Sequence, residues 1–264
     1  MHLIFTQTVY RDSILSLKLC DKDFCVNDSS AILRYSLLLF SILLTGCATT
    51  HSTVNDPFEG YNRTVHGFND TVDSYILKPI SQGYDTVLPS PARRGVSNFF
   101  SNLDDITVIV NDILQLKLMQ ALEDTGRFAL NSTLGIAGLI DVASEFGLYK
   151  NHEDFGQTLG YWGVESGPYL VLPFLGPSSL RDTVGLIGDY YTDPITYVEG
   201  PDARNPFVIT RVVDNRANLL KAEKVLEAAS FDEYSYIRDA YLQRRKNLVY
   251  DGQPPEEDFD LFDE

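Results

Sequence analysis

Residues that support catalysis or covalent cross-linking are scarce in this sequence. It has three cysteines in 264 residues, and two of them, Cys20 and Cys25, lie in the first 32. A chain that begins at the third, Cys47, has no pair of thiols for a disulfide or a thiolate metal site. Histidine is also rare, and in His152-Glu153-Asp154 the donors are adjacent, so they do not converge on one metal ion. The sequence therefore predicts no catalytic residue, no metal and no cofactor.

Positive charge is scarce as well. Lys and Arg number 21 against 37 Asp and Glu, which gives a formal net charge of −16. All of this net charge lies from Cys47 onward, because four basic and four acidic residues precede it. Such acidity argues against nucleic acid and against electrostatic docking on anionic lipid, where each Lys or Arg would contribute about 1 kcal/mol. Attachment to a membrane would have to use acyl chains and apolar surface.

An apolar run long enough to span a bilayer, roughly 20 residues, is missing. The run LLLFSILLTGC at Leu37–Cys47 has about eleven residues, the length of a signal-peptide core. It ends in Leu44-Thr45-Gly46-Cys47, the pattern of a bacterial lipoprotein processing site, where the cysteine thiol accepts a diacylglycerol before cleavage. The sequence thus predicts a lipidated Cys47. The alternative interpretation is a short buried helix of a cytosolic domain.

These features divide the chain into five segments. Residues 1–32 are interpreted as an over-extended start or a disordered segment, because a signal peptide begins shortly before its apolar core. Residues 33–46 are the predicted signal peptide, and 47–55 the lipidated cysteine with a spacer that reaches at most about 30 Å. Residues 56–250 form the body, held close to the membrane by that spacer. Residues 251–264 are an acidic tail that is predicted to be disordered.

Helical patterns dominate the body. Asp56 with Glu59 forms a capping box, Pro57 suits the first helical position, and the apolar spacing continues to Pro79, which is expected to end this helix. Further helices are predicted to begin at Pro91, at Asp104 as a cap, at about Lys117, at Ser179 as a cap with Asp182, at about residue 206, and at Ser230 as a cap with Glu233. The last is closed by Arg244, Arg245 and Lys246. Asp104-Asp105 and Arg93-Arg94 are interpreted as cap and surface charges.

Residues 155–177 have a different composition, with glycines and prolines among large apolar side chains. Pro168, Pro173 and Pro177 break helices, so loops and short extended pieces are expected here. The block is either a compact packed loop region or a flexible apolar lining that touches acyl chains. The amphipathic helices are likewise open to two interpretations, an ordinary core or partial embedding in a membrane. Embedding is favoured by the predicted anchor and by 15 Tyr and 15 Phe.

Several motifs together resemble the MlaA (VacJ) family of outer-membrane lipoproteins, over roughly residues 44–250. The matching segments are NDPFEGYNR at 55–63, PSPAR at 89–93, RFALNSTLG at 127–135, DVA at 141–143, FGQTLG at 155–160, GPYLVLPFLGPSSLRD at 167–182 and, more weakly, RDAY at 238–241. The long segment before the apolar run departs from this family, which puts the start of the chain in doubt and not the family.

The resemblance implies a mainly α protein, a single ring-like helical domain of amphipathic helices with Gly/Pro-rich loops and an amphipathic pore. It implies a lipid-anchored location on the periplasmic face of the outer membrane, and Ala48 after the lipidated cysteine fits that sorting. Such proteins remove mislocalised phospholipids from the outer leaflet and pass them to a soluble periplasmic carrier, MlaC. They partner with trimeric porins, and they break no bond, so the resemblance implies no enzyme activity.

Two sets of site residues follow for this chain. The segment His66-Gly67-Phe68-Asn69-Asp70 is a candidate gate, because Gly67 is a weak point in a strong helix. Trp162, Tyr169, Leu170 and Phe174 are candidates for lining the pore or contacting lipid. Two rival functions remain: a membrane-tethered phospholipid hydrolase that uses a serine at Ser178–Ser179, which lack a G-x-S-x-G motif, and a structural lipoprotein that binds porins.

Overall fold

The computed structural model describes residues 56–229 and 232–255, apart from the side chains of 224–229. All of them belong to one unit of the chain, Thr49–Glu264. Four predictions lie outside these residues: the over-extended start at 1–32, the signal peptide at 33–46, the lipidated Cys47 with its spacer, and the Ser230 cap. Most of the predicted acidic tail, 256–264, also lies outside them.

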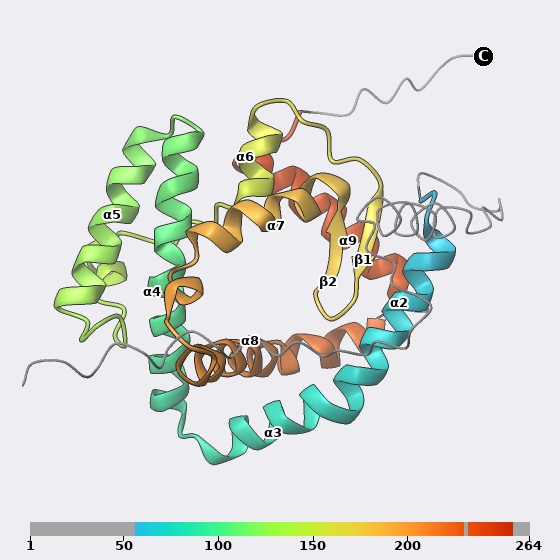
Figure 1. Ribbon diagram of the computed structural model, residues 1–264, viewed down its shortest axis with the longest axis horizontal. Helices are drawn as coiled ribbons and strands as arrows, with labels where there is room; N and C mark the ends of the chain where they lie inside the picture. Colours follow the sequence, from blue (N-terminus) through green and yellow to red (C-terminus); the bar gives the residue numbers. More distant parts are fainter. Residues whose placement is uncertain (1–55, 230–231, 256–264) are drawn as a thin grey trace, which may run out of the picture. The chain divides into compact units, whose positions relative to one another are not determined.

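Helices make up most of the described chain, with one short hairpin (Figure 1). In order, the elements are α2 (Glu59–Val72), the π-helical turn η1 (Asp73–Leu77), α3 (Lys78–Val87), α4 (Ser90–Leu114), α5 (Leu118–Thr133), the short η2 (Ala143–Phe146), α6 (Phe155–Tyr161), β1 (Tyr169–Leu172), β2 (Gly176–Ser179), α7 (Leu180–Thr192), η3 (Pro194–Tyr197), α8 (Pro201–Ala229) and α9 (Glu233–Val249). Strands β1 and β2 are antiparallel, with Tyr169 opposite Ser179.

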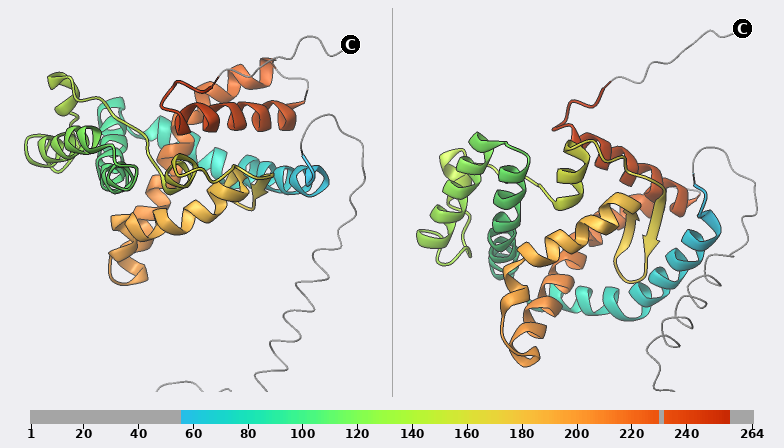
Figure 2. Two further views of the ribbon diagram at one scale, coloured as in Figure 1. Left: turned by 90° about the horizontal axis from the view of Figure 1, so that it is seen from above. Right: turned by 45° about the horizontal axis from the view of Figure 1, so that its top comes forward.

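These elements follow one another around a closed circuit, which Figure 1 shows face on. From α2 the chain continues through η1 to α3; α3 and α4 contact α8, α4 contacts α6 and α7, α6 contacts α9, α9 contacts β2, and β1 returns to α2. Helix α5 packs on α4, at the end of the unit opposite α2 (Figure 2). The predicted mainly α, ring-like class is confirmed. Among the described residues, no helix combines the length and apolarity needed to cross a membrane.

Pro79 does not end the first helix, contrary to the prediction. The chain passes from α2 through η1 into α3, where Pro79 occupies the first turn. In a regular helix the proline ring would clash with the carbonyl four residues earlier. The wider π turn, in which the Lys78 amide bonds to the Asp73 carbonyl, changes that spacing and accommodates the ring. The first predicted helix is therefore half of a longer, bent one.

The helices predicted to begin at Pro91 and at Asp104 are one helix, α4. Asp104 does not cap anything: it lies inside α4, and its carboxylate accepts a hydrogen bond from Arg211 at 3.0 Å. Asp105 is not a surface charge either, since it is fully buried and paired with Lys150. Aspartate is tolerated inside a helix when its side chain bonds to a distant cation and does not compete for the backbone.

Residues 155–161 form helix α6, where loops were expected. Asp154 caps it, accepting the Gln157 amide at 2.8 Å. Its glycines resemble helix breakers in the sequence, but they allow close packing on α7: a methyl group added at Gly156 would lie 2.5 Å from a carboxylate oxygen of Asp182. The remainder of the block, from Pro168 on, forms the hairpin β1–β2, so the short extended pieces are confirmed.

Other local predictions are confirmed. Helix α5 starts at Leu118, and the Ser179 hydroxyl caps α7 by accepting the Asp182 amide at 3.1 Å. Helix α8 covers the predicted 206–228 and starts five residues earlier, with Pro206 inside it. The cap of α9 differs from the prediction: its cap position is occupied by Asp232 and not by Ser230.

Candidate functional site

The distribution of polar and apolar side chains is inverted relative to that of a protein that folds in water. Among the described residues, buried polar and charged side chains outnumber buried apolar ones. Large apolar side chains are exposed along α3, at the α4–α5 turn, and along α7 and α8, for example Ile80, Met119, Ile187 and Ile209. Apolar surface of this extent marks contact with lipid or with another protein.

Many of the buried polar groups are hydrogen-bonded to one another. Asp214 on α8 accepts hydrogen bonds from Tyr84 on α3 at 2.8 Å, from Ser97 on α4 at 2.7 Å, and from Asn218 at 3.3 Å. One buried carboxylate therefore joins three helices without a cationic partner. A polar interior of this kind is stable where the surroundings offer no water, because unmade hydrogen bonds would be costly there.

Helix α2 is attached to strand β1 through asparagine side chains. Asn62 is fully buried; its amide donates to the Tyr169 carbonyl at 3.0 Å and accepts from the Val171 amide at 2.8 Å. Asn69, two turns later on the same face, donates to the Leu172 carbonyl at 2.9 Å and accepts from the Phe174 amide at 2.8 Å. Each amide group takes the place of a neighbouring strand's peptide. The two asparagines therefore bind the free edge of β1.

The predicted gating segment lies against this hairpin. The Phe68 ring packs edge-on against Phe174, 5.2 Å between centroids, and His66 packs against Tyr234 of α9 at 5.9 Å. Gly67 is exposed, and a methyl group added there would have no heavy atom within 4 Å. Asp70 is exposed. Within this segment, Phe68 and Asn69 contact the hairpin, so the segment lies where α2 meets β1 and β2.

The four candidate lining residues do not share one location. Phe174 is 74% exposed at the hairpin tip with a left-handed backbone, φ 64°, and Leu170 is half-buried nearby. Tyr169 is 2% exposed and packs against Tyr234 and Tyr241 of α9, so it lies in the core of the unit. Trp162 follows α6, is 59% exposed, and donates to the Leu114 carbonyl at 3.0 Å. These residues remain candidates.

Sequence reasoning missed a cluster of buried ion pairs that connects α6, α7 and α9. The Arg245 guanidinium binds Asp154 and also Asp182, the latter at 2.8 Å, and Tyr241 donates to Asp182 at 2.6 Å. Burial raises the pKa of both carboxyls, but hydrogen bonds and charge from their partners outweigh it, so the pKa of Asp154 and that of Asp182 are lowered. In the sequence Arg245 was assigned only to closing a helix.

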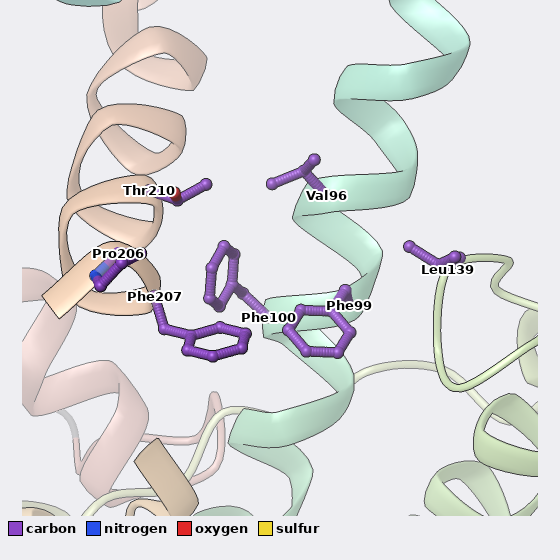
Figure 3. Close-up of a pocket in the computed structure, with 7 residues that line it drawn as sticks. All are labelled: Val96, Phe99, Phe100, Leu139, Pro206, Phe207 and Thr210. Carbon is purple, nitrogen blue, oxygen red and sulfur yellow. The ribbon is translucent and has the colours of Figure 1, made fainter. Parts of the chain in front are cut away.

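An apolar pocket of about 230 Å³ lies between α4 and α8. Figure 3 shows the rings of Phe99 and Phe100 from α4 and of Phe207 from α8 converging on it, with Leu139 at one side. Phe99 and Phe207 are stacked at 6.3 Å. Its lining is chemically suited to an acyl chain or another apolar group.

The residues considered for catalysis have structural roles. The Ser179 hydroxyl is buried as the α7 cap, and the Ser178 hydroxyl bonds to Thr183 at 2.9 Å. Glu153 binds Gln115 and Lys117, whereas Asp154 binds Arg245, so the sequence-adjacent acids face different partners. Within residues 56–229 and 232–255, no three His, Cys, Asp or Glu are grouped so as to hold a metal ion.

An apolar exterior, a largely hydrogen-bonded polar interior and a closed circuit of helices define a helical protein whose outer surface contacts lipid or another protein. Comparison with known proteins gives the family. The family model for the MlaA lipoprotein matches residues 54–248, and this chain belongs to that family, as the motifs predicted.

The relatives are close enough to compare along most of their length. The intermembrane phospholipid transport system lipoprotein MlaA of Escherichia coli (strain K12) is 36% identical over 225 residues, 83% of this chain and 89% of that protein. Its namesake in Haemophilus influenzae is 34% identical over 226 residues, 82% and 90%. A structure solved in work on the structural basis for maintenance of bacterial outer membrane lipid asymmetry is 36% identical, with a TM-score of 0.66 over 74% of this chain and all of that one. The phospholipid transport implied by the resemblance agrees with these names.

Proposed function

We propose that this protein is an outer-membrane lipoprotein that removes mislocalised phospholipids from the outer leaflet and passes them to the periplasmic carrier MlaC. The observation that carries the proposal is the inverted burial of the helical circuit. Apolar side chains on the outside suit the acyl region of one leaflet, and polar groups inside suit the passage of a headgroup. A helical ring that lies in one leaflet needs no spanning helix, and its helices satisfy their own backbone groups in lipid.

The proposed anchor is Cys47, with the spacer to residue 55 holding the helices at the periplasmic face of the membrane. A trimeric porin is the proposed partner, and the exposed apolar side chains offer surface for it. Transport breaks no covalent bond, so the proposal needs no catalytic residue. The serine roles described above support this against the hydrolase, because the Ser179 hydroxyl is occupied as a helix cap.

Replacing Cys47 by alanine tests the anchor and the function together. In a deletion strain, the wild-type gene is expected to restore low outer-leaflet phospholipid, and Cys47→Ala is expected to leave it as high as in the deletion. Outer-leaflet phospholipid is quantified directly, with the protein level checked by immunoblot. Cys25→Ala is the matched control, since an over-extended start predicts no effect there. If Cys47→Ala restored asymmetry fully, or if the purified protein released fatty acid from vesicles, the proposal would be wrong.

The proposed gate at His66–Asp70 is tested by Gly67→Ala. The methyl group meets no neighbouring atom, and alanine stabilises a helix interior by about 0.5–1 kcal/mol over glycine. The protein is therefore expected to fold normally with a stiffer α2, and to show altered outer-leaflet phospholipid and altered vancomycin and detergent sensitivity.

The matched control for the gate is Gly83→Ala in α3, where an added methyl group also has open space. It is expected to leave transport unchanged. Equal, wild-type behaviour of the two variants would remove the support for a gate at Gly67.

A further inference from the structure

Two carboxylates are buried against each other where α5 packs on α4. Asp112 lies near the end of α4 and Asp124 in α5, and neither is exposed at all. One oxygen of each is satisfied: Oδ1 of Asp112 accepts from Gln120 at 2.9 Å, and Oδ2 of Asp124 accepts from Asn151 at 3.0 Å. The other oxygens, Oδ2 of Asp112 and Oδ1 of Asp124, have no amide, hydroxyl or cationic donor.

Gln120, which donates to Asp112, lies one helical turn before Asp124 on α5, so the two buried carboxyls occupy the same part of the α4–α5 contact. The effect of Asp124 on the pKa of Asp112 is that of a hydrogen-bonded neighbour. An ionised carboxylate only accepts hydrogen bonds, so a bond between two carboxyl groups requires a proton on one of them. The two oxygens without other donors are the ones available for this bond. Two ionised carboxylates placed there would repel each other without water to screen them.

The surrounding charges do not remove the need for that proton. Lys117, in the α4–α5 turn, is bound by Glu153 at 2.9 Å and by Asp251 at 2.5 Å. Lys150 and Arg127 face Asp105 on α4, and Arg127 also binds Asp141. This region therefore contains three cations and six carboxylates, Asp112 and Asp124 included. Each of the three cations already forms an ion pair with another carboxylate. His152, on the same loop, has a lowered pKa because of its burial, followed by nearby cations, and adds no positive charge at neutral pH.

We propose that Asp112 and Asp124 share a single proton, and that this proton is a latch that holds α5 on α4 and releases it at alkaline pH. Burial, followed by the hydrogen bond and the charge of Asp124, raises the pKa of Asp112 to about 8. An exposed aspartate titrates near 3.9. Because the folded-state pKa is the higher one, the stabilisation is complete below about pH 4 and is lost as pH rises through about 8.

Release of the latch would change the lipid-facing surface. Leu116, Leu118, Met119 and Leu122, in the turn and the first part of α5, are all more than half exposed. Alkaline pH would then loosen that apolar surface and weaken transport. This consequence rests on the proposed function, whereas the latch itself does not. The latch itself is measured without any transport assay, so it can fail independently of the proposed function.

Hydrogen exchange of the full-length protein in detergent micelles, from pH 6 to 9.5, tests the latch. Opening of α5 releases one proton, so its opening constant, corrected for intrinsic exchange, is expected to rise tenfold per pH unit up to about pH 8 and then to level. In Asp112→Asn the amide donates permanently to Asp124, and the pH dependence is expected to vanish. Glu123→Gln, which removes an exposed charge from the same helix, is expected to keep the wild-type slope.

A slope that persists in Asp112→Asn, or is lost in Glu123→Gln, overturns the proposal. So does a wild-type slope that Mg²⁺ or Ca²⁺ abolishes, because the pair would then be a cation site. If Asp112→Asn does not fold, the infrared spectrum of the wild-type protein decides. A carbonyl stretch of a protonated carboxylic acid at pH 7 that disappears above about pH 9 supports the latch, and its absence at pH 7 contradicts it.

Discussion

Asn62→Ala is expected to lower the free energy of unfolding by about 3 kcal/mol or more and to abolish transport. The substitution leaves the Tyr169 carbonyl and the Val171 amide without partners in a buried site, and each such group costs about 1–3 kcal/mol. Asp56 also loses the bond that Asn62 donates to it at 3.0 Å. Since Asn62 joins α2 to β1, its loss would open the circuit where the proposed gate meets the hairpin.

Denaturant unfolding of purified protein in micelles measures this change, with outer-leaflet phospholipid as the functional readout. The matched control is Asn98→Ala, because Asn98 makes a single bond, to the Leu139 carbonyl at 3.2 Å near the surface. It is expected to cost under about 1 kcal/mol. Similar losses in the two variants would contradict the role assigned to Asn62.

Arg245→Met is expected to cost about 3–5 kcal/mol, the range for removing one partner from a buried ion pair. Asp154 and Asp182 would remain buried without their shared cation. In the wild-type protein their lowered pKa values mean that their stabilisation is present above about pH 4 and lost as pH falls through the folded-state pKa values. In the variant Asp182 keeps the hydrogen bonds from Tyr241 and Arg181, and Asp154 keeps those from Gln157. Only the part of this acid dependence that Arg245 supplies is removed, so stability is expected to fall less steeply with acid than in the wild type.

Unfolding at several pH values checks both parts of this expectation. Arg244→Met, at the exposed neighbouring position, is the control and is expected to stay within about 0.5 kcal/mol of the wild type. Adding Asp154→Asn to Arg245→Met should recover part of the loss, because Arg245 is the cation that binds Asp154 and the uncompensated charge is then removed. A variant whose stability still falls with acid as in the wild type would show that Arg245 does not hold these carboxylates ionised.

Local chemistry explains what could be predicted. The Ser179 cap, the start of α5 and the extended pieces around Pro168 to Pro177 depend on residues within one turn of each other, and all three are confirmed. Where a local pattern has two solutions, sequence reasoning chose wrongly. Asp104 matches a cap as well as a helix-interior partner of Arg211, which lies 107 residues away. The glycines of α6 match a loop as well as a contact with α7.

The site depended even more on distant partners. The gating segment was placed on α2 from Gly67 alone, yet Asn69 binds a strand more than 100 residues away, and Asn62 was not singled out. Tyr169 is a candidate lining residue because it lies among apolar neighbours in the sequence, and its packing against α9 could not be read from those neighbours. The Asp112–Asp124 pair and the ion pairs of Arg245 could not be predicted from neighbouring residues. The sequence around an aspartate does not show whether water, a cation or a second carboxyl group lies next to its side chain.

The amino-acid sequence by itself determined the family, the helical class, the starts of α5 and α7, and the prediction of a lipidated Cys47 followed by a body without a membrane span. These properties follow from motifs and periodicities within short stretches of chain. Only the tertiary structure decided which polar groups are buried, which cation serves which carboxylate, and how the helices close into a circuit with apolar side chains outside. The physical reason is that burial and pairing are properties of distant segments brought together, and no local pattern contains the partner.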